Sequence, residues 1–325
     1  MTIRYIPELD GLRTIAAVAV VAFHTRLPGL PGGFLGVDVF FVLSGYLTAS
    51  IALSRRYSCV EFLARRLRRL WPLLLFVSAA VAAVLIAFDR SVWSEVLPGA
   101  LFFGNIWVAK YGTISVMVHA WTLGAEMQFY AVLALLVLVA PSLWTFRAIA
   151  AGLFIAMTVT RIGFANAENW QSGFYHPLSH SSGLFLGMIL ATLPLERVRA
   201  APVLFAASII VGLLAFTHAR FATAAALSYW ITITELASAG VIASVVSGVG
   251  PIGAVLRAPV MRLLGVWSFG IYLWHYPIAV YARVTYSDGI DFLLTLIASI
   301  ILAALTYYLV ERPTRAAGFG ILRKP

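Results

Sequence analysis

The stretch that decides the fold is Arg13–Tyr46, RTIAAVAVVAFHTRLPGLPGGFLGVDVFFVLSGY. Two apolar segments are joined by a turn rich in Pro and Gly, which predicts two helices running in opposite directions. An Arg, a His and an Asp lie within these segments. An ionisable side chain at membrane depth is costly, so it generally faces a protein interior and marks a functional site. We therefore expect this helix pair to form the centre of a site inside a membrane protein.

The composition of the whole chain is that of a polytopic membrane protein. Of its 325 residues, 62% are hydrophobic and only 11% are charged, whereas soluble domains carry about 25% charged residues. The net charge of +10 would suggest nucleic acid binding in a soluble protein, but cytoplasmic loops of membrane proteins also collect Lys and Arg. We expect membrane lipid and no nucleic acid as a partner. The single cysteine excludes an internal disulfide and a cysteine-based metal cluster.

Ten apolar runs are long enough to cross a hydrocarbon core about 30 Å thick. They lie at about 12–28, 35–54, 71–88, 122–143, 146–164, 178–194, 201–217, 222–248, 262–284 and 290–310. A shorter apolar run near 97–109 is expected to be a re-entrant or surface helix on the outer side. No polar block is long enough to fold alone, so residues 1–325 are expected to form a single all-α membrane domain, one bundle of about ten transmembrane helices.

The basic residues predict the orientation of this bundle. With ten spans and a cytoplasmic N-terminus, seventeen of the 23 Lys and Arg residues fall in inside segments. The outside segments hold the other six, which are Arg26, Arg90, Lys110, Arg161, Arg220 and Arg283. This bias follows the positive-inside rule, so both termini are expected to be cytoplasmic.

Four arginines just before the third span form the most basic part of the chain: Arg65, Arg66, Arg68 and Arg69. Such clusters are most often anchors that bind anionic lipid headgroups. The alternative is a phosphate site, because guanidinium groups grip phosphates bidentately.

The first helix carries the first candidate for chemistry. His24 lies about 16 Å along the helix axis from Arg13. Its imidazole is suited to accept a proton from a hydroxyl, although a lone intramembrane His often only bonds a neighbouring helix. Asp38 is either an ordinary interface carboxylate or is directed at His24, where it would orient the ring. Ser44–Gly45 is expected to let helices pack closely, and the glycines near 29–36 to form a tight turn.

Two further clusters place polar side chains in apolar runs. In HAWTLGAEMQFY (119–130), an N-cap explains Thr122, but Glu126 lies past the first turn and is a functional candidate. In LGVWSFGIYLWHYPI (264–278), Tyr272 and His275 belong either to an interfacial aromatic belt or to a site. His176 and His180 have a spacing that suits a metal, but no third ligand is nearby, so no metal site is expected.

Six segments in order resemble the acyltransferase-3 family of membrane O-acyltransferases. They are ELDGLRTIAAVAVVAFH, GGFLGVDVFFVLSGYL, RRLRRLWP, AWTLGAEMQFY, SFGIYLWHYPI and YYLVERP. This resemblance implies a multi-pass enzyme of the bacterial inner (plasma) membrane. It would transfer an acyl group, expected to be acetyl, from acyl-CoA as co-substrate to a hydroxyl of an acceptor. The acceptor would be a carbohydrate or glycosylated molecule, such as a cell-surface polysaccharide, the cell wall or an antibiotic. No bound cofactor is implied.

The resemblance also assigns residues. The family's Arg, ten residues, His pattern falls on Arg13 and on His24, its presumed catalytic residue. Its Arg-rich motif falls on the four-arginine cluster, and its Trp-Ser-Leu-x-x-Glu element begins at Trp121. Two features depart from the family pattern: Thr122 replaces Ser, and Met127 stands where a second acidic residue is common. A paired-carboxylate mechanism is therefore not expected. Some family members carry an appended periplasmic esterase-like domain, which is not expected in residues 1–325.

A mechanism follows as a hypothesis. Arg13 and the arginine cluster would bind the CoA phosphates, and His24 would act as general base, oriented by Asp38 or Glu126. An acyl-histidine intermediate is the alternative. The residues expected to line the site or bind the acceptor are Trp121, Thr122, His119, His275 and Tyr272. A transporter or flippase of a saccharide or lipid intermediate is the rival function. A homo-oligomer is left open.

Overall fold

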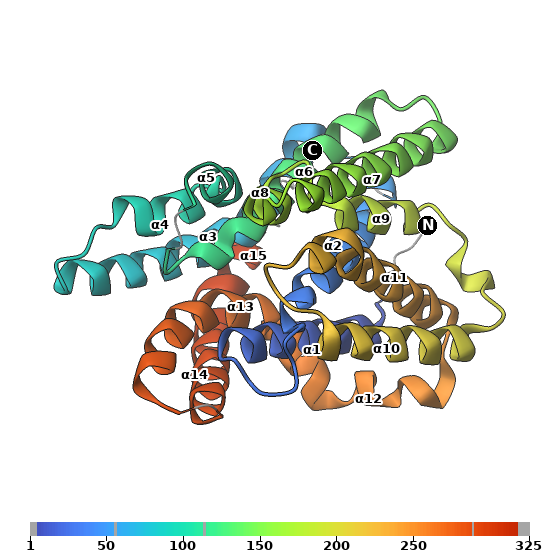
Figure 1. Cartoon of the computed structure of the whole chain (residues 1–325). Helices are drawn as coiled ribbons and strands as arrows, with labels where there is room; N and C mark the ends of the chain where they lie inside the picture. The colour runs from blue at the N-terminus through green and yellow to red at the C-terminus, as the bar shows by residue number, and fades with distance from the viewer. Residues whose placement is uncertain (1–4, 55–56, 113–114, 288, 318–325) are drawn as a thin grey trace.

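The computed structural model describes residues 5–54, 57–112, 115–287 and 289–317 (Figure 1). These residues form helices and turns and contain no strand, so the predicted all-α class is confirmed. Both chain ends, and with them Arg4, Arg323 and Lys324, lie outside the described residues, as do Arg55 and Arg56. The α-helices are α1 (Pro7–His24), α2 (Gly36–Ser54), α3 (Cys59–Ala87), α4 (Trp93–Ala100), α5 (Gly104–Tyr111), α6 (Trp121–Val139), α7 (Leu143–Asn166), α8 (Trp170–Tyr175), α9 (Ser182–Leu190), α10 (Ala201–His218), α11 (Ile231–Ser247), α12 (Ala254–Arg257), α13 (Pro259–Thr285), α14 (Ile290–Thr306) and α15 (Arg312–Ala317).

Eight helical stretches in the described part of the chain are long and apolar enough to cross a membrane. They correspond to eight of the ten expected spans. Of the other two, α1 has 18 residues but carries Glu8, Asp10 and Arg13. The helix α9 has only nine residues, roughly 14 Å, which is less than half the hydrocarbon thickness. The expected continuous helix over 178–194 is therefore wrong, and a count of ten spans with cytoplasmic termini stays a prediction.

The short outer helix expected near 97–109 is a pair of helices. The first, α4, ends at Ala100 and the second, α5, begins at Gly104. Phe102, between them, has a left-handed backbone with φ of 62°, which interrupts the helical path. The two short helices lie beside α3 and α6, and Figure 1 shows α3, α4 and α5 extending together to one side of the bundle.

The helix α1 lies at the centre of the contacts that build the site. It packs along α13 and against α2, while α13 also packs along α14 (Figure 1). Toward the outside of the bundle, large apolar side chains stay exposed, among them Leu138, Val159 and Leu309. An apolar exterior of this kind is stable only where lipid covers it.

The helices α2 and α9 touch backbone to backbone. A Cβ atom added to Gly45 would lie 2.0 Å from the carbonyl oxygen of Leu184, and one added to Gly187 would lie 2.0 Å from that of Val42. Only glycine permits so close an approach, as in other small-residue contacts of membrane helices. The predicted role of Ser44–Gly45 in close packing is confirmed.

The glycines of the turn before α2 serve the fold in the same way. A Cβ atom on Gly33 would lie 2.2 Å from the carbonyl oxygen of Ala19, and one on Gly36 would lie 2.5 Å from that of Ala16. The returning chain is thus pressed onto the α1 backbone. This contact fixes the start of α2 beside the part of α1 that separates Arg13 from His24.

Candidate active site

The helix α1 carries its two predicted residues into two different cavities. Arg13 lines a cavity of about 80 Å³, here termed the inner cavity. His24, the last residue of α1, lines a second cavity of about 280 Å³, here termed the outer cavity. The names follow the predicted orientation of the chain.

The inner cavity is lined by both basic and acidic side chains. Arg13 from α1 and Arg69 from α3 both line it, together with Glu126 from α6. The Nη1 atom of Arg13 donates to Oδ1 of Asp10 at 3.1 Å, and the arginine side chain remains 20% exposed. The Glu126 carboxylate accepts from the hydroxyl of Tyr130 at 3.3 Å. Two guanidinium groups and one carboxylate thus line this cavity, and a second carboxylate, that of Asp10, bonds Arg13.

The four arginines at 65–69 do not form one site. Arg65 donates to Glu61 at 2.9 Å, Arg66 is buried with its guanidinium 5.5 Å from the Phe62 ring centre, and Arg68 is exposed. Only Arg69 lines the inner cavity. Successive residues of an α-helix are about 100° apart around its axis, so neighbouring arginines point in different directions. The structure brings one member of the motif to Arg13 and not the other three.

Two histidines, His24 and His119, line the outer cavity beside Tyr276, and a third, His275, packs against both of their rings but lines neither cavity. The ring of His24 is half-buried and lies edge-on to Tyr276, with ring centres 4.6 Å apart. His275 of α13 lies 5.3 Å from the His24 ring, and His119, just before α6, stacks on Tyr276 at 5.3 Å. His24 has no hydrogen bond to the described part of the chain, so its ring nitrogens are open to a ligand.

The other two histidines are held by backbone carbonyl groups. Nε2 of His119 lies 3.1 Å from the oxygen of Leu273, and Nδ1 of His275 lies 2.5 Å from that of Tyr272. A nitrogen that faces a carbonyl oxygen must carry the proton. The second nitrogen of each ring is buried without a partner, and it can accept a hydrogen bond. Among the described residues no set of three His, Cys, Asp or Glu side chains is arranged to hold a metal.

Tyr272 stands between the two cavities. It lines both of them, as does Val37. Its hydroxyl donates to the carbonyl oxygen of His119 at 2.6 Å and bonds the Thr122 hydroxyl at 2.9 Å. The predicted N-cap role of Thr122 is wrong, because Ala120 occupies the N-cap of α6 and no side chain caps this helix. Thr122 instead holds the tyrosine that separates the cavities.

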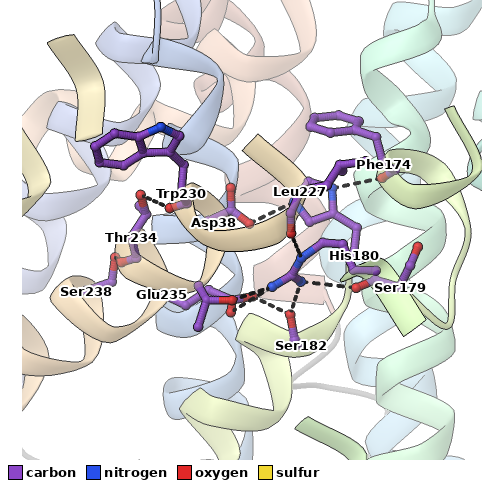
Figure 2. Close-up of polar contacts among 12 residues, drawn as sticks. Asp38, Phe174, Ser179, His180, Ser182, Leu227, Trp230, Thr234, Glu235 and Ser238 are labelled. Carbon is purple, nitrogen blue, oxygen red and sulfur yellow. Dashed lines mark hydrogen bonds and ion pairs between the residues drawn. The ribbon is translucent and has the colours of Figure 1, made fainter. Parts of the chain in front are cut away.

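Asp38 does not pair with His24. Its Oδ1 atom lies 2.8 Å from Nε2 of His180, and its Oδ2 atom is buried without a partner (Figure 2). Nδ1 of His180 lies 2.8 Å from the carbonyl oxygen of Phe174. Both ring nitrogens thus face acceptors, so the pair holds a proton that makes either His180 an imidazolium or Asp38 a carboxylic acid. Glu126 does not reach His24 either, since it lines the inner cavity and His24 the outer one.

A buried ion pair that the sequence reasoning missed lies next to Asp38. Arg161 of α7 is fully buried, with its Nη2 atom 3.8 Å from Oε2 of Glu235 of α11. Its other hydrogen bonds go to the Leu227 and Ser179 carbonyl oxygens and to the Ser182 and Thr232 hydroxyls. The Ser182 hydroxyl accepts from Nη1 of Arg161 and donates to Oε1 of Glu235, and Figure 2 shows Ser182 next to Glu235. Arg161 is therefore a buried residue between helices, although the positive-inside count placed it in an outer segment.

The Asp38–His180 pair packs against the wall of the outer cavity. The His180 ring packs against Trp121 and Phe174, with ring centres 5.1 and 4.4 Å apart. Both aromatic rings line the outer cavity. Asp38 thus contacts the aromatic wall of the outer cavity through His180. For the Arg161–Glu235 pair, the available signal in the sequence was an Arg and a Glu within apolar helices.

The fold and site define an all-helical membrane protein with two cavities along its first helix. One contains arginines and lies near the middle of α1, and the other contains histidines and lies at its end. The chain belongs to the acyltransferase-3 family, because residues 6–310 match the family described as an acyltransferase domain. The chain is similar to YrhL of Bacillus subtilis, provisionally named a peptidoglycan O-acetyltransferase, with 30% identity over 97% of this chain and 56% of the relative. It is 28% identical to the O-acetyltransferase OatA of Staphylococcus aureus over 97% of this chain and 58% of OatA.

The chain thus spans less than three fifths of the length of these relatives. No solved structure matches it. The family and its bacterial members, together with the eight apolar helices, identify the chain as a multi-pass bacterial membrane protein.

Proposed function

We propose that the chain is a membrane O-acetyltransferase that moves an acetyl group from acetyl-CoA to a hydroxyl of a cell-envelope carbohydrate. The observation that carries this proposal is the pair of cavities that meet at Tyr272 and Val37. The names of YrhL and OatA support the acetyl group, and the name of YrhL supports a peptidoglycan acceptor.

Two arginines and the distance to His24 support the inner cavity as the place that binds the phosphates of the donor. Arg13 and Arg69 offer guanidinium groups for the CoA phosphates, which they bind with short, charge-assisted hydrogen bonds. From Arg13 to His24 the helix rises roughly 16 Å, a distance that an extended pantetheine arm can span. The thioester would then reach the wall at Tyr272, next to the histidines of the outer cavity.

The chemistry assigned to His24 is that of a general base. The acceptor oxygen attacks the thioester carbonyl carbon, the carbon–sulfur bond breaks, and the hydroxyl proton passes to His24 and then to the CoA thiolate. The buried free nitrogen of His119, which lines the outer cavity, would accept a hydrogen bond from another hydroxyl of the acceptor and so hold the reacting one in place.

An assay with purified protein in liposomes tests this function. Labelled acetyl-CoA is added with a muropeptide, the disaccharide-peptide unit of peptidoglycan, as acceptor. The proposal expects CoA release and label on the muropeptide. Movement of the saccharide across the bilayer without consumption of thioester would instead establish the transporter or flippase.

Arg13→Ala and Arg69→Ala are each expected to raise KM for acetyl-CoA by roughly tenfold or more with little change in kcat. The reason is that a hydrogen bond to a charged group contributes about 1.5–3 kcal/mol. Initial rates over a range of acetyl-CoA concentrations measure this. Arg68→Ala is the matched control, because Arg68 lies on the same helix but is exposed to solvent. An equal effect of all three substitutions would contradict a specific phosphate site.

Tyr272→Ala is expected to increase acetyl-CoA hydrolysis in the absence of acceptor. Removing the ring joins the two cavities, so water from the outer cavity reaches the thioester, and exclusion of water is what normally suppresses such side reactions. CoA release without muropeptide measures the leak. Tyr272→Phe keeps the ring, so its acetyl-CoA hydrolysis without acceptor should stay at the wild-type level. An equal rise of hydrolysis in both variants would argue against a role of Tyr272 as a wall.

A further inference from the structure

The outer cavity has a charge that the proposed reaction does not use. Arg26 and Arg283 both line it, and no Asp or Glu does. Neither arginine forms an ion pair with any described residue, whereas Arg13, Arg65, Arg161, Arg257 and Arg315 all do. The cavity that holds His24 therefore has two cationic groups that form no ion pair with the described residues.

Arg26 is placed at the cavity by the way α1 ends. The amide of Leu27 donates to the carbonyl oxygen of Ala22, and the amide of Arg26 donates to that of Phe23. This is the Schellman arrangement, in which the residue at the Arg26 position is left-handed and usually glycine. Arg26 adopts φ of 56° there, a conformation that is unfavourable for an arginine. The backbone of Arg26 is thus held two residues beyond His24.

Arg283 reaches the same cavity from α13. Its guanidinium carbon lies 5.9 Å from the centre of the Tyr276 ring, and the same ring contacts His24. A cation over an aromatic ring is attracted to its face and is thereby oriented. Tyr276 therefore lies between the second arginine and the histidine proposed to act as base.

The remaining walls are suited to a sugar. Trp121, Phe174, Tyr175 and Phe221 line the outer cavity. Aromatic rings combine apolar faces with polar tips, so they can pack against the C–H face of a pyranose while its hydroxyls bond elsewhere. A volume of about 280 Å³ is near the lower end for small-molecule sites and suits a single sugar unit rather than a polymer segment.

We propose that the outer cavity binds a saccharide that carries an oxyanion, a carboxylate or a phosphate, with Arg26 and Arg283 as its recognition groups. The anion would fix the sugar so that one hydroxyl faces His24. The role of this sugar as acceptor rests on the proposed acetyl transfer, whereas its binding does not.

The test is a binding measurement on the full chain in phosphatidylcholine nanodiscs, without acetyl-CoA. Glucose and glucuronic acid form a matched pair, since they differ only in the oxidation of C6. The fluorescence of Trp121 in the cavity wall, or saturation-transfer NMR, follows binding. Glucuronic acid should bind roughly tenfold or more tightly than glucose, as expected for a charged hydrogen bond. The affinity for glucose 6-phosphate, compared with that for glucuronic acid, shows whether the cavity prefers a phosphate or a carboxylate.

Arg26→Gly and Arg283→Gln should each remove most of this preference and leave the affinity for glucose unchanged. Arg26→Gly is the sharper variant, because glycine is the residue that best suits the left-handed helix end, so lost binding cannot be attributed to a damaged fold. Lys110→Gln, which removes one exposed charge on α5, is the charge-matched control and should bind like the wild type.

Three results would overturn the proposal. The first is equal affinity of the wild type for glucose and glucuronic acid. The second is an effect of Lys110→Gln as large as that of Arg26→Gly. The third is inorganic phosphate that binds as tightly as glucose 6-phosphate, which would mark a general anion or lipid headgroup site. Since no thioester is present, none of these results bears on whether acetyl transfer occurs.

Discussion

His24→Ala is expected to lower acetyl transfer to the muropeptide by roughly 10²–10⁴-fold, the range that a positioned general base contributes. The His24 ring lies in the outer cavity and forms no hydrogen bond with the described residues. Its removal therefore takes away the proton acceptor without breaking a hydrogen bond of the fold. Label transfer from acetyl-CoA, at matched protein level in liposomes, measures the effect. Binding of acetyl-CoA should be unchanged, because Arg13 and Arg69 are intact.

His218→Ala serves as the control for this variant. His218 is exposed at the end of α10 and bonds only its neighbours Leu214 and Thr217, so activity should be retained. A His24→Ala protein with wild-type transfer would exclude the proposed chemistry. Rapid quenching of the wild type with labelled acetyl-CoA and no acceptor separates two roles: label on the peptide containing His24 would indicate an acyl-histidine, and its absence a general base.

Arg161→Met is expected to destabilise the fold by about 3–5 kcal/mol, because it leaves the buried Glu235 carboxylate without its cation. The substitution also removes the hydrogen bonds by which α7 holds Ser182 and Thr232. Thermal unfolding followed by fluorescence-detected size exclusion should show a clear drop in the melting temperature. Transfer activity of the protein that remains folded reports separately on the outer cavity.

The double variant Arg161→Met/Glu235→Gln gives the matched comparison. Removing the charge from both partners should restore part of the lost stability, since the unpaired buried charge causes most of the loss. Equal stability of the double and the single variant would show that the hydrogen bonds of Arg161, and not its ion pair, hold the three helices. A single variant that melts like the wild type would remove the structural role altogether.

The sequence predicted the fold class because hydropathy is a local property of the chain. The pattern of Arg13 and His24 on one helix was also sufficient to place them at separate depths, since the rise of an α-helix is fixed. The short α9 was not predictable in the same way. It begins at Ser182 after an irregular segment, and it is stabilised by the backbone contact at Gly187 with α2 rather than by its own length.

The site was predicted where it depends on one helix and missed where it depends on pairing between helices. The sequence suggested either an interface position for Asp38 or a contact with His24, its neighbour in the hairpin, but its partner His180 lies 142 positions away. Arg161 and Glu235 each stood in an apolar run without a motif, and nothing in a single sequence joins them. The four arginines at 65–69 were grouped by proximity in sequence, although the helical rotation sends only Arg69 to the cavity.

The shared wall at Tyr272 and Val37 also bears on the membrane as an ionic barrier. A continuous aqueous channel from one cavity to the other would let protons and other ions leak through the bundle. Tyr272 and Val37 stand where the two cavities meet, and only a group of a few atoms needs to pass between them for acetyl transfer. The arrangement would allow chemistry begun on one side of a membrane to be finished toward the other while the ion gradients across it are kept.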